Sequence, residues 1–334
     1  KYLSIDTFTG LVKSKEKIKS WNINIIKFQI GIVYFFSGIA KLNYDWIVEA
    51  QPLSNWLKHQ TDLPILGGIM EFPETAFLFS WAGCLFDLFI VFILLNNRLR
   101  IYGYLLVIFF HGITSAMFPI GVFPFVMIIS TLIFFSESFH IKFIKIIQII
   151  FNQKNFKLLN FLKKIHSNIK LKKQLVPIKI QATLLIIFVS FQLLLPLRHF
   201  LYDGNLFWTE QGFRFSWRVM LIEKVGYAQF YIHDHKGRRK LINNKKFLTG
   251  QQEKMMGTQP DMILQFAHHL RDTYTDTNLI EKNGEIIRLD SPKVTAEIYV
   301  SLFNRGSRLF IDSSVNLSKI KRGFHEKNWI INYH

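Results

Sequence analysis

The chain has 334 residues, half of them hydrophobic, with 34 phenylalanines and a formal net charge of +18. This combination argues against a small soluble enzyme and is typical of a membrane protein whose cytoplasmic loops carry Lys and Arg. The apolar runs make nucleic acid the weaker of the partners that a basic chain can have. The single cysteine, Cys84, excludes an intramolecular disulfide.

Five apolar segments predict membrane-spanning helices, because about 20 apolar residues cross the hydrocarbon core as a helix. In chain order they are 24–42, 76–95, 101–118, 122–135 and 180–197, the fourth being short. We therefore expect a mainly α, multi-pass transmembrane bundle over residues 1–200. The chain begins with Lys1 and lacks a signal-peptide pattern there, so we also expect it to be incomplete at its N-terminus.

Between the fourth and fifth spans, residues 141–179 contain ten lysines and no acid. Lysines that alternate with Ile, Phe and Leu predict a basic amphipathic segment on an anionic membrane surface. Five spans place this segment, Arg98 and Arg100 on the cytoplasmic side, as the positive-inside rule requires. The loop 44–75, with a short amphipathic piece at 53–59, and everything after Tyr202 then lie outside.

After Tyr202 the composition changes to charges of both signs and short alternating strands. Segments 227–233 and 239–242 predict a hairpin, as do 297–303 and 308–312, and 261–273 predicts a helix. Residues 201–334 are therefore predicted to form a smaller extracytoplasmic α+β domain.

Three ionisable residues lie inside predicted spans, where such groups are costly and usually functional. Lys41 shares a helix face with Ser37, Gly38 and Tyr34, so a desolvated amine there could act as a base. The alternative is a lysine that snorkels to the interface and pairs with Asp45.

His111 could carry protons, or it could be a neutral histidine hydrogen-bonded between helices. For Asp87 an interhelical partner is the preferred interpretation, and a ligand or proton role is the alternative. His233 and His235 flank a turn without a nearby third ligand, and His268 and His269 point apart, so we expect no metal site.

A polar and aromatic cluster follows the fifth span at the outer interface. These residues could anchor the interface or could form the wall of a pocket for a lipid-soluble ligand. They are Asn205, Trp208, Trp217, Arg218 and Met220.

Two stretches resemble the vitamin K-dependent γ-carboxylase family with its HTTM domain. They are YFFSGIAKLNYDWIVEAQPLSNWL at 34–57 and LPLRHFLYDGNLFWTEQGFRFSWRVMLIEKVG at 195–226. Between them, HGITSAMFPIGVFPFVM at 111–127 is also similar to that family. The resemblance implies Lys41 as the base for a hydroquinone and His111 as a second catalytic residue. It implies quinone- or substrate-binding positions at Tyr34, Phe123, Asn205, Phe215, Ser216, Trp217 and Met220.

The resemblance further implies a membrane enzyme that carboxylates peptidyl glutamate and couples this to hydroquinone epoxidation by O2. Its co-substrates would be vitamin K hydroquinone or a menaquinol-type quinol, O2 and CO2, without a metal. Its partners would be membrane lipid and a glutamate-containing protein. The family's second histidine, on an earlier helix, would precede Lys1. The alternative function is a non-enzymatic membrane protein that binds quinone or lipid.

Overall fold

The computed structural model describes residues 19–64, 67–150, 177–280 and 286–333. They form two compact units: Lys1–Phe35 with Leu85–Leu193, and Phe36–Cys84 with Leu194–His334. The second unit thus joins the loop after the first long helix to the C-terminal part of the chain. The boundary predicted at residue 200 stays a prediction.

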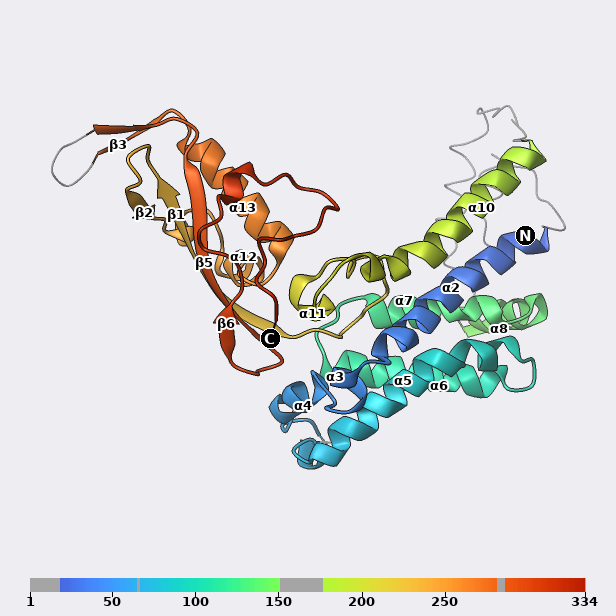
Figure 1. The fold of residues 1–334 in the computed structure, drawn as a ribbon. Coiled ribbons are helices and arrows are strands. Elements are labelled where there is room, and N and C mark those ends of the chain that lie inside the picture. Colours follow the sequence, from blue (N-terminus) through green and yellow to red (C-terminus); the bar gives the residue numbers. More distant parts are fainter. Residues whose placement is uncertain (1–18, 65–66, 151–176, 281–285, 334) are drawn as a thin grey trace. The chain divides into compact units, whose positions relative to one another are not determined.

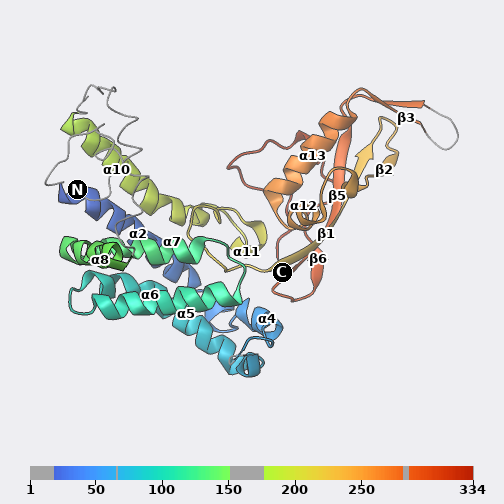
Figure 2. The same ribbon diagram turned by 180° about the vertical axis from the view of Figure 1, so that it is seen from behind.

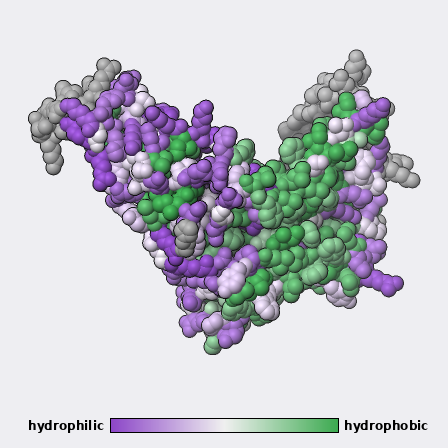
Figure 3. Space-filling model, in the orientation of Figure 1, coloured by the Kyte–Doolittle hydropathy of each residue, from purple (hydrophilic) through white to green (hydrophobic). Residues whose placement is uncertain are grey.

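Among the described residues, four helices are long and apolar enough to cross a membrane. They are α2 (Ser20–Lys41), α5 (Pro73–Leu95), α6 (Arg100–Met117) and α10 (Ile178–Leu194), which the 3-10 helix η5 (Leu195–Leu201) continues (Figure 1). A helix satisfies its backbone polar groups internally, as lipid requires. Figure 3 shows hydrophobic surface over these helices. Leu78 and Phe92 on α5 and Ile186 on α10 are among their exposed apolar side chains. A multi-pass α-helical membrane protein is confirmed.

The segment 122–135, expected as a span, does not form one straight helix. Helix α7 (Phe123–Ser130) tightens into the 3-10 helix η3 (Thr131–Phe134), and α8 (Glu137–Ile150) then leaves at a bend of 119°. The Thr131 hydroxyl donates to the carbonyl oxygens of Met127 and Ile128, at 3.0 and 2.9 Å, which favours the tighter turn. A fifth span exists only if this bent pair counts as one.

The predicted basic segment 141–179 begins within α8 and ends within α10. Its central part, 151–176, lies outside the described residues. Its location on a membrane surface therefore stays a prediction.

In the second unit, short helices follow α2 as α3 (Tyr44–Ile47), α4 (Leu53–Trp56), η1 (Leu57–His59) and η2 (Gly67–Ile69). Two hydrogen bonds hold this loop to the start of α5. The Trp46 indole donates to the carbonyl oxygen of Ser80 at 2.8 Å, and the Ser80 hydroxyl donates to the carbonyl oxygen of Trp46. These reciprocal bonds fix the chain just beyond the end of α2.

The C-terminal part contains a four-stranded antiparallel sheet in the order β2-β1-β5-β6. Its strands are β1 (Lys224–His233), β2 (Arg239–Leu241), β5 (Lys293–Leu302) and β6 (Ser307–Leu309), and a separate pair is β3 (Thr277–Ile280) with β4 (Ile286–Leu289). The register of β1 on β5 runs from Lys224 opposite Leu302 to His233 opposite Lys293. Both predicted hairpins are confirmed.

Helices α12 (Gly250–Met256) and α13 (Pro260–Tyr274) pack on one face of this sheet (Figures 1 and 2). The buried face of β1 alternates through Ala228, Phe230 and Ile232, as a half-buried strand requires. Phe230 meets Phe266 of α13 edge to face, with ring centroids 4.9 Å apart. Burial of one such ring contributes about 1.5–3 kcal/mol.

The loop between η5 and β1 is fixed to this sheet. Its short helix α11 (Leu206–Thr209) places the Trp208 indole to donate to the carbonyl oxygen of Ile331 at 2.7 Å. From β1, the Lys224 ammonium donates to the carbonyl oxygen of Trp208 at 2.7 Å and to Glu210 Oε1 at 2.8 Å. The loop that carries most of the predicted binding residues is therefore anchored by strand β1 and by the segment at Ile331.

Candidate functional site

Lys41 ends helix α2 and is only 6% exposed. Its ammonium donates to Ser37 Oγ at 2.9 Å, one helical turn back, and lies 5.3 Å from the ring centroid of Trp46. Asp45, the partner expected of a snorkelling lysine, pairs instead with Arg305 at 2.6 Å. The amine is thus held inside the protein at the end of a predicted span.

Tyr34 and His111 form a buried pair in the first unit. The Tyr34 hydroxyl and His111 Nε2 are 2.9 Å apart, which joins α2 to α6. Aromatic rings surround the imidazole, with Phe110 at 5.3 Å and Phe123 at 6.3 Å between centroids. This is the geometry of a histidine hydrogen-bonded between helices, whereas a proton-carrying role stays a prediction.

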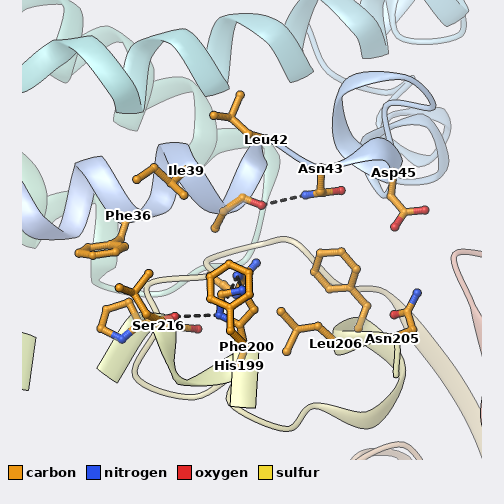
Figure 4. Close-up of a pocket in the computed structure, with 15 residues that line it drawn as sticks. Phe36, Ile39, Leu42, Asn43, Asp45, His199, Phe200, Asn205, Leu206 and Ser216 are labelled. Atoms are coloured by element: carbon orange, nitrogen blue, oxygen red, sulfur yellow. Dashed lines mark hydrogen bonds between the residues drawn. The ribbon is translucent and has the colours of Figure 1, made fainter. Parts of the chain in front are cut away.

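The second unit contains a pocket of about 400 Å³. One wall is the end of α2 with the turn after it, and the other comes from η5, α11 and the loop that follows (Figure 4). The first wall consists of Phe36, Ile39, Ala40, Leu42, Asn43 and Asp45; the second consists of Pro196, Leu197, His199, Phe200, Asn205, Leu206, Phe207, Ser216 and Arg218. Its volume and apolar lining with a few polar groups are those of a small-molecule site.

The segment 215–220 has an unusual backbone. Phe215, Trp217 and Met220 adopt left-handed φ values of 58°, 57° and 56°. Each costs about 1–2 kcal/mol for a residue other than glycine. Ser216 lies buried between them, 2% exposed, and donates its hydroxyl hydrogen to the carbonyl oxygen of Phe213, whereas Phe215 is 75% exposed. The alternation turns Ser216 and Arg218 into the pocket and leaves Phe215 outside it.

His199 and Arg218 meet in the second wall. His199 Nδ1 lies 2.9 Å from the carbonyl oxygen of Pro196, and Arg218 Nη2 lies 3.2 Å from His199 Nε2. One tautomer satisfies both contacts: Nδ1–H donates to the carbonyl oxygen, and Nε2 accepts from the guanidinium. Burial lowers the pKa of Arg218 from its ordinary value.

Comparison with protein families gives two matches that follow one another along the chain. Residues 1–139 match the HTTM domain, and residues 178–334 match the lumenal domain of vitamin K-dependent gamma-carboxylase. The chain belongs to the vitamin K-dependent γ-carboxylase family. No solved structure matches it. The fold class and the family predicted from the sequence are confirmed.

Membership of the γ-carboxylase family brings a membrane setting and a lumenal C-terminal domain. It also implies the use of vitamin K and a glutamate-containing protein as substrate. Among the described residues of this γ-carboxylase-like protein, no group of three or more His, Cys, Asp and Glu side chains is arranged to hold a metal ion.

The structure places the sequence-predicted residues of this carboxylase-like protein in three groups. Tyr34, His111 and Phe123 are together in the first unit. Lys41 belongs to the second unit, where it bonds with Ser37 at the end of α2. The remaining five belong to one loop of the second unit: Asn205 and Ser216 line the pocket, and Phe215, Trp217 and Met220 are not among its lining residues.

Other residues weighed in the sequence have structural partners. Asp87 is buried on α5 at 5% exposure, and the Cys84 thiol lies 3.7 Å from the carbonyl oxygen of Gly38. His233 bonds with Thr295 Oγ1 at 2.8 Å, and His268 donates to the carbonyl oxygen of Ile320 at 2.8 Å. These contacts give both histidines structural roles.

Sequence reasoning missed His199, Phe36 and Phe200 as pocket residues of this family member. The signal for His199 was available, since it follows the last span directly in the stretch LPLRHF. Only the fold shows that η5 brings this stretch opposite the end of α2 within the second unit.

Proposed function

We propose that this protein is a quinol-dependent glutamyl carboxylase in which Lys41 is the base that accepts a proton from the hydroquinone. The observation that supports this most directly is the burial of the Lys41 amine against Ser37 and Trp46 at the end of α2. A lysine that only marked the membrane edge would reach water and pair there with Asp45.

The residues of this chain would prepare the co-substrate rather than attack the glutamate. The γ-carbon of glutamate is a very weak acid, and vitamin K hydroquinone with O2 supplies the strong base that no side chain provides. Lys41 would accept one phenolic proton, and Ser37, within hydrogen-bonding distance, would orient the amine for that transfer. The buried surroundings would keep water from quenching the base.

The aromatic lining of the pocket fits an aromatic, membrane-soluble co-substrate. Phe36, Phe200 and Phe207 line the pocket that begins at the end of the first span. Such rings pack against a quinol ring edge to face or offset. In the first unit, His111 would carry protons through its contact with Tyr34, and Phe123 would form part of the surrounding apolar wall.

The test compares Lys41→Ala with Lys58→Ala in the full chain, reconstituted in lipid nanodiscs with vitamin K hydroquinone, O2, labelled bicarbonate and a glutamyl peptide. Lys58 is an exposed lysine of η1 and serves as the matched control. We expect Lys41→Ala to lose epoxide formation by about 100-fold or more, the scale of general acid–base catalysis. Epoxidation at the wild-type rate in Lys41→Ala would refute the proposal.

The same assay also tests the alternative function, that of a non-enzymatic membrane protein that binds quinone or lipid. Such a protein would bind quinone saturably, but the wild type would form neither epoxide nor carboxylated peptide. The apolar pocket alone is compatible with either activity.

A further inference from the structure

The guanidinium of Arg218 brings a charge into the pocket that no acid of the described chain balances. No carboxylate there forms an ion pair with it, and its Nε is buried without a hydrogen-bond partner. Among the described residues, its side-chain hydrogen-bond partner is the imidazole of His199, which accepts the bond and adds no negative charge. A half-buried cation in this state favours an anionic ligand.

The second charged residue of the lining does not supply that anion. Asp45 is occupied by Arg305, which lies 2.6 Å away and also pairs with Glu49. The side-chain oxygens of Asn43 and Asn205 are used as well, because they accept the backbone N–H groups that begin α3 and α11. The pocket therefore combines an apolar wall with one uncompensated cation.

We propose that Arg218 binds the side-chain carboxylate of the glutamyl substrate, with His199 as the residue that positions the guanidinium. The identity of the substrate rests on the proposed function. A guanidinium presents parallel N–H donors that match the two oxygens of a carboxylate. The apolar side chains of Ile39 and Leu197 would contact the methylene groups of the glutamyl side chain and leave Phe36, Phe200 and Phe207 to the quinol ring.

This arrangement also has a chemical consequence. Removal of a proton from the γ-carbon places a second negative charge next to the carboxylate. A cation held at that carboxylate stabilises the doubly negative state more than the singly negative one, which lowers the barrier. Because His199 contacts the guanidinium and Gly212 lies close against the backbone of His199, little reorganisation is needed at that moment.

The test measures peptide binding without quinol, O2 or CO2, in the full chain in nanodiscs of zwitterionic lipid. The probes are acetyl-Ala-Glu-Ala-amide and its Gln counterpart, which differ only in the side-chain charge. The variants are Arg218→Gln, Arg218→Lys and, as a control, Arg239→Gln, which removes a largely exposed arginine of β2.

We expect the wild type and Arg239→Gln to prefer the Glu peptide, and Arg218→Gln to bind it about 10- to 100-fold more weakly and lose the preference. Arg218→Lys, which keeps the charge without the fork, should show a smaller loss and guards against misfolding of the Gln variant. Equal binding of both peptides by the wild type, or an unchanged preference in Arg218→Gln and Arg218→Lys, would overturn the inference. A preference that anionic lipid abolishes in the wild type would also overturn it, since the cation would then serve lipid phosphate.

Failure of this inference and failure of the proposed function give different results. Carboxylation with an unchanged KM for the peptide in Arg218→Gln would refute the carboxylate site and leave the carboxylase intact. Arg218-dependent binding of the Glu peptide without any epoxide or carboxylated product would support the site and refute the catalytic proposal.

Discussion

Gly212 is where the loop behind the pocket touches the residue that positions Arg218. Its φ is +77°, and an added Cβ would lie 2.5 Å from His199 Cα and 2.7 Å from its backbone nitrogen. Gly237, in the β1–β2 turn, has a similar φ of +80° but nothing within 4 Å of an added Cβ. The two glycines therefore separate backbone strain from a steric clash.

Gly237→Ala should lose about 1–2 kcal/mol of unfolding free energy, the cost of the left-handed conformation alone. Gly212→Ala should lose that amount and about 1–3 kcal/mol more, because backbone atoms of His199 must move to accept the methyl group. Thermal unfolding of both variants in the same detergent gives the comparison. Binding of the Glu peptide should weaken in Gly212→Ala and stay unchanged in Gly237→Ala.

Equal stability losses in the two variants would refute the clash. If Gly212→Ala were destabilised but kept full peptide affinity, the contact with His199 would stabilise the fold without affecting the pocket. The proposed positioning of Arg218 through His199 would then be wrong.

Arg305→Met should destabilise the protein by about 1–3 kcal/mol, since it leaves the partly buried Asp45 and its neighbour Glu49 without their cation. A double-mutant cycle with Asp45→Asn should show a coupling energy between the two positions. Strictly additive stability losses would contradict the ion pair. Burial and the nearby Lys293 lower the pKa of His233 from its ordinary 6.5. Because the unfolded chain binds this proton more readily, stability should fall as pH drops through 6.5 toward the folded-state pKa. Unfolding midpoints measured from pH 7.5 to 5.5 should depend less on pH in His233→Gln than in the wild type, and identical slopes would contradict the shift.

The long helices could be predicted closely because length and apolar content suffice to define a span. The expected segment 24–42 is α2, and 76–95 is α5 with three more residues at its start. The segment 122–135 fails as a single span for a local reason, since Thr131 bonds back to the preceding turn and the chain bends after Phe134. Hydropathy does not detect such a hydrogen bond.

The pocket could be predicted only in part, because one wall is local in sequence and the other is not. Asn205 and Arg218 are predicted from the stretch that follows the last span, whereas Ser216 comes from the resemblance alone, which gives equal weight to Phe215, Trp217 and Met220. The left-handed conformation at these three positions decides which side chains enter the pocket, and nothing in the residue types requires it.

Helix geometry also distinguishes Lys41 from the residues of α2 that line the pocket. Successive residues of an α-helix are about 100° apart, so Phe36 and Ala40 lie on one face of α2 and Ser37 and Lys41 on the next. The first face lines the pocket, and Lys41 is not among its lining residues. Lys41 follows Ala40, a lining residue of the pocket, so the base proposed for the hydroquinone is next in the chain to the pocket proposed for the glutamate. Since Lys41 is proposed to act on the hydroquinone and Arg218 on the glutamate, loss of Lys41 should suppress epoxide formation while the Glu peptide still binds, and loss of Arg218 should weaken that binding.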